Sequence, residues 1–382
     1  MLYPIGIQSF EDIRRGGYVY VDKTALIYKL AATGKYYFLS RPRRFGKSLL
    51  VSTMEAYFKG KKELFDGLAV ASLEKDWTEY PVLHLDLGGA NYADMDALKE
   101  KLGRQLNDLE SEYGVVRKYK TLPVRFETII EAAYRKTGRQ VVILVDEYDK
   151  PVIDNLDRPE LQDKMRETLL GFYGVMKSKD GRIRLGFLTG VTKIGKMSVF
   201  SDLNNPQDIS MDKEYPDICG ISESDLKVYF TESVKELAEA NDLTEEECYR
   251  KLAIMYDGYH FHPKAVGVYN PFSLLNTFDK QEFGSYWFET GTPTYLVELL
   301  KRNHYNLEEM AHAETYADVL NSIYGDEDPL PVIFQSGYLT IKEYDPRFGL
   351  YRLGFPNREV EEGFVKFLMP FYTRFNKIEA PF

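Results

Sequence analysis

The sequence predicts an α/β fold, in which a mostly parallel sheet is followed by a helical lid and a winged-helix-like C-terminal part. The apolar run 36–39 precedes a short loop, the tripeptide Gly46-Lys47-Ser48 and a helical pattern over 49–58. A second apolar run, rich in β-branched residues, covers 140–145 and ends in two acids. Such a run is typical of a central parallel strand that is covered on both faces. Strands and helical segments alternate up to residue 192, which favours a doubly wound sheet.

The segment 40–48 has the order of parts that a phosphate-binding loop needs: a strand, a short loop, Gly-Lys-Ser and a helix. Backbone N–H groups of such a loop and of the helix start point at one spot and hold an anion there. Lys47 would reach the β and γ phosphates of a nucleotide, and the Ser48 hydroxyl would ligate Mg²⁺. The strict pattern has its first glycine at the position of Arg41, so the motif is only half complete. The residues predicted to bind the nucleotide are Arg43, Arg44, Phe45, Gly46, Lys47, Ser48 and Leu49.

Two acids, Asp146 and Glu147, follow the apolar run 140–145 and are the second indication of a nucleotide site. Open α/β sheets hold their ligands beyond the carboxyl ends of their strands. There Asp146 would hold Mg²⁺ through water, and Glu147 would orient and deprotonate the attacking water. The alternative is that the two acids merely end a buried strand at a solvated turn. Together with the loop before residue 48, the pair predicts a P-loop NTPase that uses ATP and Mg²⁺.

A third candidate follows the strand predicted over 184–191. A polar residue leaving this strand would sense the γ-phosphate. Thr192 is the residue that we expect in this role, with Thr189 and Lys193 as alternatives. The other interpretation of Thr192 is that it caps its own turn.

The segment before the loop, residues 1–35, is expected to contribute a short strand over 18–21 and a helix over 25–32. Tyr3, Ile5 and Phe10 form either an apolar wall against the adenine or simply part of the core. The remaining elements expected in the first part are a strand over 81–87, helical periodicity over 95–137 and a helix over 160–177.

Beyond residue 210 the pattern changes to amphipathic helical segments over 222–240 and 243–256. A helix ending near Gly337 and two strand-like runs joined by a turn then suggest a winged helix. Winged helices bind DNA, dock proteins or serve as ATPase lids; the mixed, aromatic composition here favours the last two. The expected division is a nucleotide-binding domain over 1–210, a helical lid over 211–300 and a winged-helix-like domain over 301–382.

The charge balance limits the classes of partner. The net charge is −10, with 59 acidic and 49 basic residues, which weighs against a protein whose whole surface coats nucleic acid. Arg41, Arg43, Arg44 and Lys47 form a local basic patch, whose simplest partner is a triphosphate. His260 and His262 lack a nearby carboxylate at ligand spacing, so ordinary loop residues are favoured there over a metal site.

Targeting signals and cysteine usage bear on location. No secretory signal and no apolar run of membrane-spanning length is visible in the sequence. The two cysteines, Cys219 and Cys248, stand in no motif spacing, which fits a reducing compartment and excludes a cysteine zinc site. We therefore expect a cytoplasmic protein.

With these motifs in hand, the chain resembles the bacterial AAA-ATPase-like proteins over nearly its full length. In that family Arg41-Pro42-Arg43-Arg44-Phe45 is the ordinary form of the loop, so the missing glycine is not peculiar to this chain. The strings that carry the resemblance are YPIGIQSF (3–10), YVYVDKT (18–24), FLSRPRRFGKS (38–48), VDEYDKP (145–151), FSDLNN (200–205), GYHF (258–261) and GFPNREV (354–360).

The resemblance implies an ATPase of the broader AAA+ or STAND kind, related to archaeal ATPases that carry a helical lid and a winged helix. It also implies a further C-terminal domain similar to PD-(D/E)xK nucleases. No strand with an Asp and a following Glu-x-Lys occurs in residues 1–382, so we expect no nuclease activity from them.

The resulting hypothesis is an ATP-binding, Mg²⁺-dependent ATP-hydrolysing switch. Lys47, Glu147 and Thr192 are the expected catalytic residues, and Ser48 and Asp146 the expected metal ligands. The alternative is a nucleotide-gated module that binds ATP or ADP with little or no turnover. In either case the C-terminal part is a candidate docking site for a protein or DNA.

Overall fold

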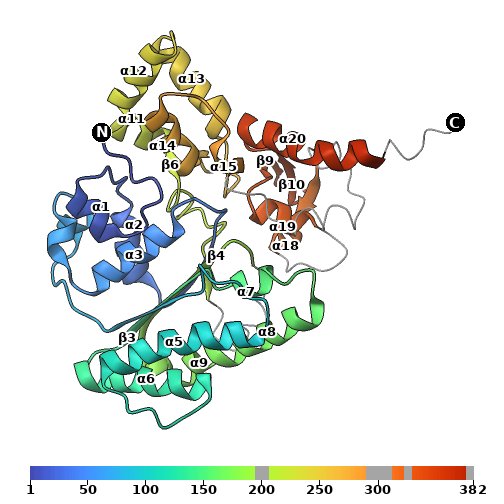
Figure 1. The fold of residues 1–382 in the computed structure, drawn as a ribbon. Coiled ribbons are helices and arrows are strands. Elements are labelled where there is room, and N and C mark those ends of the chain that lie inside the picture. The colour runs from blue at the N-terminus through green and yellow to red at the C-terminus, as the bar shows by residue number, and fades with distance from the viewer. Residues whose placement is uncertain (194–205, 290–311, 322–328, 376–382) are drawn as a thin grey trace. The chain divides into compact units, whose positions relative to one another are not determined.

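The computed structural model describes residues 1–193, 206–289, 312–321 and 329–375, and the string 200–205 lies outside them (Figure 1). The chain forms two compact units. The sheet unit consists of residues 7–41 and 46–219, and the C-terminal unit of residues 1–6, 42–45 and 220–382. The division into three domains stays a prediction, and part of its third domain lies outside the described residues.

The sheet unit contains a five-stranded sheet in the order β2-β3-β4-β1-β5, and each neighbouring pair is parallel. This confirms the predicted α/β class. Every residue of β1 and β3 is buried, as the continuous apolar runs predict. The strands are β1 (Tyr36–Ser40), β2 (Val82–Asp86), β3 (Val141–Asp146), β4 (Ile183–Gly190) and β5 (Gln207–Asp208).

Helices cover this sheet, with α1 to α3 on one side and α5, α6, α8 and α9 on the other (Figure 1). On α5 the predicted leucine stripe at 98, 102, 106 and 109 is buried. The α-helices are α1 (Phe10–Gly16), α2 (Thr24–Thr33), α3 (Lys47–Phe58), α4 (Val70–Leu73), α5 (Met95–Tyr113), α6 (Leu122–Thr137), α7 (Lys150–Ile153), α8 (Pro159–Tyr173) and α9 (Val175–Ser178). The described residues of the unit also include two 3₁₀ helices, η1 (Lys62–Phe65) and η2 (Asp180–Arg182).

Two local predictions in this unit are wrong. Residues 18–21 form no strand: Tyr18 N–H closes the end of α1 by donating to Ile13 O, and no other chain segment pairs with them among the described residues. Their β-branched and aromatic side chains favour a strand, but a strand needs a partner. The helix expected over 160–177 is interrupted at Gly174, between α8 and α9.

From residue 220 the C-terminal unit continues with a group of helices, as the amphipathic pattern predicts. Ser222 and Thr244 each form a reciprocal capping box, with Asp225 and Glu247 respectively. The helices are α11 (Glu223–Tyr229), α12 (Thr231–Ala240), α13 (Glu245–Tyr256), α14 (Pro271–Lys280) and α15 (Tyr286–Glu289). A two-stranded antiparallel sheet joins β6 (Ile221–Ser222) to β7 (Val268–Tyr269).

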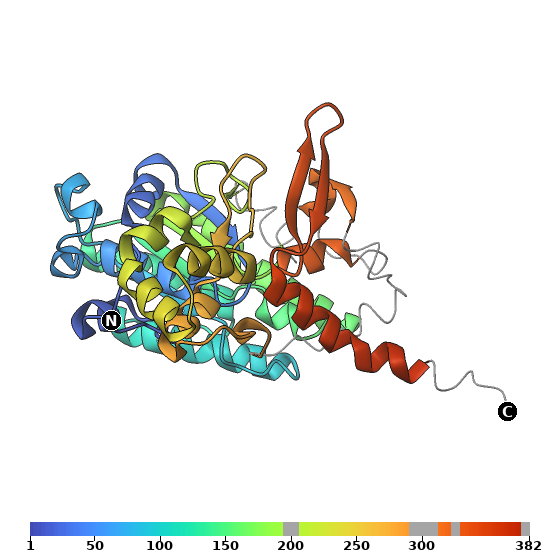
Figure 2. The same ribbon diagram turned by 90° about the horizontal axis from the view of Figure 1, so that it is seen from above.

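Further along, α18 (Ala317–Leu320) and α19 (Leu330–Gln335) precede a hairpin of β9 (Thr340–Asp345) and β10 (Leu350–Gly354) (Figure 2). The predicted helix and two strands are therefore present. A third strand, β8 (Glu314–Tyr316), pairs with β10 and was not predicted. The long helix α20 (Arg358–Phe375) follows the hairpin.

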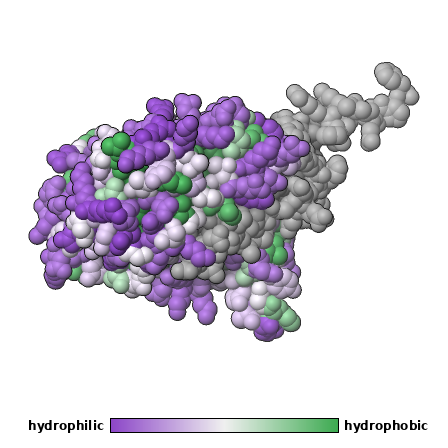
Figure 3. All heavy atoms as spheres, turned by 90° about the horizontal axis from the view of Figure 1, so that it is seen from below, coloured by the Kyte–Doolittle hydropathy of each residue, from purple (hydrophilic) through white to green (hydrophobic). Residues whose placement is uncertain are grey.

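No helix among the described residues is both long enough and apolar enough to cross a membrane. On the face drawn in Figure 3, apolar side chains are scattered among hydrophilic ones.

Candidate functional site

The loop between β1 and α3 is the first component of the site. β1 ends at Ser40 and α3 begins at Lys47, with Gly46 at the N-cap. Gly46 adopts a left-handed conformation with φ of 90°, which only glycine tolerates without strain. Because Gly46 has no side chain, it leaves the first N–H groups of α3 without a side-chain cap of their own. Amides of this kind at a helix start bind anions.

Lys47 and Ser48 occupy the first turn of α3. The Lys47 side chain is buried, and its ammonium donates a hydrogen bond to the Arg41 carbonyl at 3.0 Å. The Ser48 hydroxyl donates to the carboxylate of Asp146. Leu49 follows in the same turn and is half-buried. The Ser48 hydroxyl lies close enough to Asp146 to lower the pKa of its carboxyl, although the two predicted metal ligands are distant in the sequence.

Asp146 and Glu147 lie at the carboxyl end of β3. Asp86, the last residue of β2, is the register partner of Asp146 on the neighbouring strand. A Cβ atom at Gly88 would lie 2.9 Å from Asp86 Oδ1 and 3.3 Å from Glu147 Oε2. Gly88 therefore leaves room for the carboxylates of Asp86 and Glu147. Sequence reasoning missed Asp86, although an acid ends β2 just as one ends β3.

Glu147 has a strained backbone. Its φ is 50°, in the left-handed region, and its N–H donates to Asp146 Oδ1 at 2.9 Å. This conformation costs a non-glycine residue about 1–2 kcal/mol. Strain of this kind is concentrated at functional sites, where the surrounding structure maintains it.

Burial raises the pKa of both Asp146 and Glu147 above the usual carboxyl values. For Asp146 the hydrogen bond from Ser48 and the charge of Lys47 lower the pKa in part, and for Glu147 the charge of Lys47 does so. Asp86 adds a further negative charge that raises both. Carboxylates concentrated around one ammonium favour the binding of an additional cation.

The donor set can be compared with the needs of Mg²⁺. Among the described residues, no three acidic, histidine or cysteine side chains are arranged to hold a metal ion by themselves. Mg²⁺ in nucleotide sites takes only one or two protein ligands, with phosphate oxygens and waters completing its shell. The Ser48 hydroxyl and the Asp146 carboxylate fit that requirement, because they are two oxygen donors close enough for Ser48 to lower the pKa of Asp146.

The exit of β4 is bonded to the segment after β3. Asp149 is fully buried and accepts hydrogen bonds from the Thr192 N–H at 2.6 Å and the Thr192 hydroxyl at 2.9 Å. The Tyr148 hydroxyl donates to the Thr192 carbonyl at 3.0 Å. A Cβ atom at Gly190 would lie 2.2 Å from Asp149 Oδ1, so this contact requires glycine there. Sequence reasoning did not single out Asp149, whose role depends on long-range packing.

The two alternatives to Thr192 have other partners. The Thr189 hydroxyl donates to the Leu39 carbonyl inside the sheet, and the Lys193 ammonium pairs with Asp208 at 2.7 Å. Thr192 itself bonds across to another element rather than capping its own turn.

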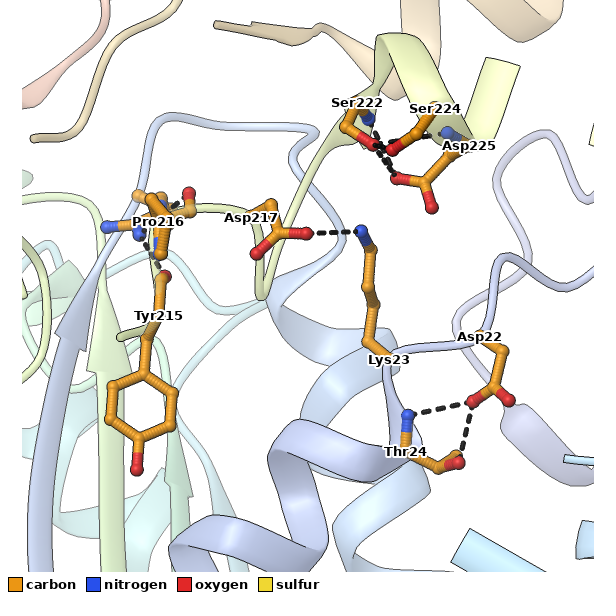
Figure 4. Close-up of polar contacts among 10 residues, drawn as sticks. Asp22, Lys23, Thr24, Tyr215, Pro216, Asp217, Ser222, Ser224 and Asp225 are labelled. Carbon is orange, nitrogen blue, oxygen red and sulfur yellow. Dashed lines mark hydrogen bonds and ion pairs between the residues drawn. The ribbon is translucent and has the colours of Figure 1, made fainter. Parts of the chain in front are cut away.

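The basic patch proposed from the sequence needs a correction at Arg41. This side chain is 1% exposed, and its guanidinium donates to the backbone carbonyls of Ser210, at 2.7 Å, and Tyr215, at 3.1 Å. It therefore faces the interior of the sheet unit. Nearby, Lys23 forms an ion pair with Asp217, and Asp22 accepts hydrogen bonds from the N–H and hydroxyl of Thr24 (Figure 4).

The remaining loop residues belong to the C-terminal unit. Arg43 is half-buried and accepts a hydrogen bond at its carbonyl from the indole of Trp287. Arg44 is exposed, with its guanidinium 5.0 Å from the centre of the Phe272 ring. Phe45 is fully buried.

The suggested adenine wall is not supported at Phe10. That ring has no exposed surface and packs against Tyr20 and Phe65, which favours the core interpretation. Tyr3 lies in the other unit, where its hydroxyl donates to Ser233. The roles of Tyr3 and Ile5 against a nucleotide remain predictions.

Two comparisons with known proteins identify the family of this chain. The model of a family described as predicted AAA-ATPase, AAA-ATPase-like, matches residues 4–200. A protein of Azotobacter chroococcum mcd 1, described as the uncharacterized protein in the vnfD 5' region, is 42% identical over 365 residues. That alignment covers 94% of this chain and 68% of the relative. The chain therefore belongs to the AAA-ATPase-like family of predicted AAA-ATPases.

Proposed function

We propose that this protein binds ATP with Mg²⁺ at the loop 41–48 and hydrolyses it, as a molecular switch. The observation that carries the proposal is the closeness of the Ser48 hydroxyl to the Asp146 carboxyl, whose pKa it lowers. Lys47 directly precedes Ser48 in the sequence, and the strained Glu147 directly follows Asp146. Family membership supports nucleotide binding, because the matched region contains all four residues.

Each residue has a separate task in this proposal. The loop amides and Lys47 bind the phosphates, with Gly46 permitting the turn. Mg²⁺, held by Ser48 and Asp146, would neutralise charge on the phosphate oxygens. Arg43 and Arg44 are candidates for further charge near the γ-phosphate.

Glu147 orients the attacking water and accepts its proton. A carboxylate whose pKa is raised by burial is a better base near neutral pH than an ordinary one, because general bases work best when their pKa approaches the ambient pH. The left-handed backbone of Glu147 fixes the direction in which its side chain leaves β3. Thr192, held by Asp149, would sense the γ-phosphate.

Phosphate release from ATP tests the proposal through Glu147→Gln. The variant should bind ATP like the wild type and lose turnover by roughly 10²–10⁴-fold, the usual contribution of a general base. Glu100→Gln, an exposed position on α5, is the matched control and should keep full turnover. Equal, measurable turnover in Glu147→Gln and the wild type would refute the assigned role.

A second candidate function is a nucleotide-gated module that docks a protein through its hairpin. The tip residue Phe348 is 69% exposed, which suits a protein contact. The hairpin arginines are less suited to DNA, since Arg352 pairs with Glu314 and Glu343 and Arg347 with Asp345. Tight ATP retention without turnover in the wild type would favour this candidate. Filter binding to DNA over a salt series tests the nucleic-acid variant, for which a steep salt slope is expected.

A further inference from the structure

Four residues of the phosphate loop, Pro42 to Phe45, pack within the C-terminal unit. The Phe45 ring is 1% exposed and stands edge-to-face against Tyr259, with centroids 4.7 Å apart, and against Phe261, at 5.7 Å. The indole N–H of Trp287 donates to the Arg43 carbonyl at 3.0 Å. These four residues thus contact side chains of the same unit that lie more than two hundred positions further along the sequence.

Trp287 is itself held firmly. Its backbone N–H donates to Glu359 at 2.8 Å, and Glu359 is fully buried at the start of α20. Glu359 also accepts the hydroxyl of Ser273, on α14, at 2.8 Å. The ring of Tyr338 lies against the Trp287 indole, with centroids 5.2 Å apart. The position of the indole therefore depends on the packing of α14, α15 and α20.

Pro42, the first of the four loop residues, lies very close to Gly337 of the same unit. A Cβ atom at Gly337 would lie 2.6 Å from Pro42 Cγ, so only glycine fits between them. The φ of Gly337 is 88°, which favours glycine as well. Pro42 is thus held by its contact with Gly337, and Phe45 by the aromatic rings against which it packs.

The hydrogen bond from the Trp287 indole to the Arg43 carbonyl also affects the Arg44 N–H, which belongs to the same peptide group. The peptide group between Arg43 and Arg44 is planar and trans, so the Arg43 carbonyl and the Arg44 N–H point in opposite directions. Fixing the carbonyl therefore fixes where that N–H points. Arg44 has a φ of 66°, a left-handed conformation that a non-glycine residue adopts only when its surroundings hold it.

We propose that Trp287 is a positioning residue of the phosphate loop, through which nucleotide binding and the packing around α15 and α20 influence each other. The proposal rests on the proposed nucleotide site. A phosphate loop binds through the direction of its amides, so a nucleotide and the Trp287 bond act on the same peptide groups. Coupling of this kind is reciprocal: whatever shifts Trp287 changes nucleotide affinity, and nucleotide binding shifts Trp287.

The chain provides its own reporter for a test. It contains two tryptophans, Trp77 and Trp287. The Trp77 indole nitrogen is buried without a hydrogen-bond partner in the described part of the chain, so Trp77→Phe removes no known bond and leaves Trp287 as the sole tryptophan. Titrating this variant with ATP and Mg²⁺ should change Trp287 emission saturably, with the midpoint that calorimetry gives for the same titration.

A second variant tests the direction of the influence. Trp287→Phe keeps an aromatic ring and loses the donor to Arg43, and we expect about 2- to 10-fold weaker ATP binding, as one hydrogen bond warrants. The matched control is Tyr286→Phe, which removes a hydroxyl that donates to the carbonyl of Glu282. It should bind ATP like the wild type. Far-UV circular dichroism verifies that both variants are folded.

The outcomes separate this inference from the function on which it rests. Calorimetric ATP binding with unchanged Trp287 emission and wild-type affinity in Trp287→Phe would overturn the positioning role and leave the nucleotide site standing. Absence of ATP binding in the wild type would overturn both. Equal weakening in Trp287→Phe and Tyr286→Phe would mean a general loss of packing and would also overturn the inference.

Discussion

Arg41 occupies the position at which the strict phosphate-loop pattern has glycine. The structure and the motif predict different effects of Arg41→Gly on stability, so this variant distinguishes between them. The motif alone predicts that glycine is harmless or beneficial at this position. The structure predicts a large loss of stability, because the guanidinium is buried and binds backbone carbonyls of Ser210 and Tyr215. The guanidinium also donates to the neighbouring Ser40 carbonyl, at 2.9 Å, and to the Pro216 carbonyl, at 3.4 Å.

The size of the loss follows from these contacts. A hydrogen bond from a charged donor contributes about 1.5–3 kcal/mol, so the bonds to Ser210 and Tyr215 alone give about 3 kcal/mol at the low end. Burial lowers the pKa of Arg41 to about 10, which means that burying the charged guanidinium costs free energy. The change to glycine removes this cost and so offsets part of the loss. Glycine also leaves the buried carbonyls without donors and creates a cavity, both of which destabilise the fold. We expect a net loss of about 3 kcal/mol or more in the free energy of unfolding.

Thermal and urea unfolding of the nucleotide-free protein measure this loss. For a unit of this size, 3 kcal/mol lowers the melting temperature by roughly 6–12 °C. Arg41→Met fills most of the volume without donating, and should fall between the wild type and Arg41→Gly. An Arg41→Gly protein within about 1 kcal/mol of the wild type would refute the structural role of Arg41.

Two further predictions concern Glu147 and His84. Glu147→Ala and Glu147→Gly both remove the buried carboxylate, but only glycine accepts φ of 50° freely, so the glycine variant should be more stable by about 1 kcal/mol in urea unfolding; equal stability would exclude backbone strain. For His84, burial lowers the pKa, but the hydrogen bond and charge of Glu55, 2.8 Å away, raise it more, so the net pKa is raised. The stability that His84 contributes is therefore fully present below its unfolded pKa of about 6.5 and is lost as pH rises through the folded value. Burial raises the pKa of Glu55, but the hydrogen bonds and charges of His84 and Lys59 lower it to about 2, so its carboxylate stays ionised in acid. The stability gap between the wild type and His84→Gln should thus be larger at pH 5.5 than at pH 9, and an equal gap at both would contradict this assignment.

The sequence predicted those parts of the fold whose signals are local. The fully buried β1 and β3, the leucine stripe of α5 and the capping boxes at Ser222 and Thr244 are each encoded within a few residues. The pairing of β8 with β10 was not predictable, since it joins residues more than thirty positions apart in the chain (Leu350 with Tyr316). Residues 18–21 show the converse case, a strand-like composition without a strand partner.

In the candidate site, too, some residues are recognisable from local sequence and others only from the folded structure. Glycine, lysine and the two acids are recognisable from local context, and the sheet brings Ser48 and Asp146 together. The direction of the Arg41 side chain, the hydrogen bond from Thr192 to Asp149 and the packing of Phe45 against Tyr259 all depend on residues distant in the chain. A basic residue in a motif indicates charge, but only packing decides whether that charge faces a ligand or the interior.

Calorimetric titration of ATP and Mg²⁺ into the full chain tests the central claim most directly, with Lys47→Ala beside the wild type. Lys59→Ala, a lysine just beyond the other end of α3, is the matched control. We predict saturable binding in the wild type and in Lys59→Ala, and a loss of roughly 100-fold or more in Lys47→Ala, because charge-assisted bonds to phosphate are removed. Wild-type affinity in Lys47→Ala would contradict the claim that a nucleotide is held by its phosphates at this loop.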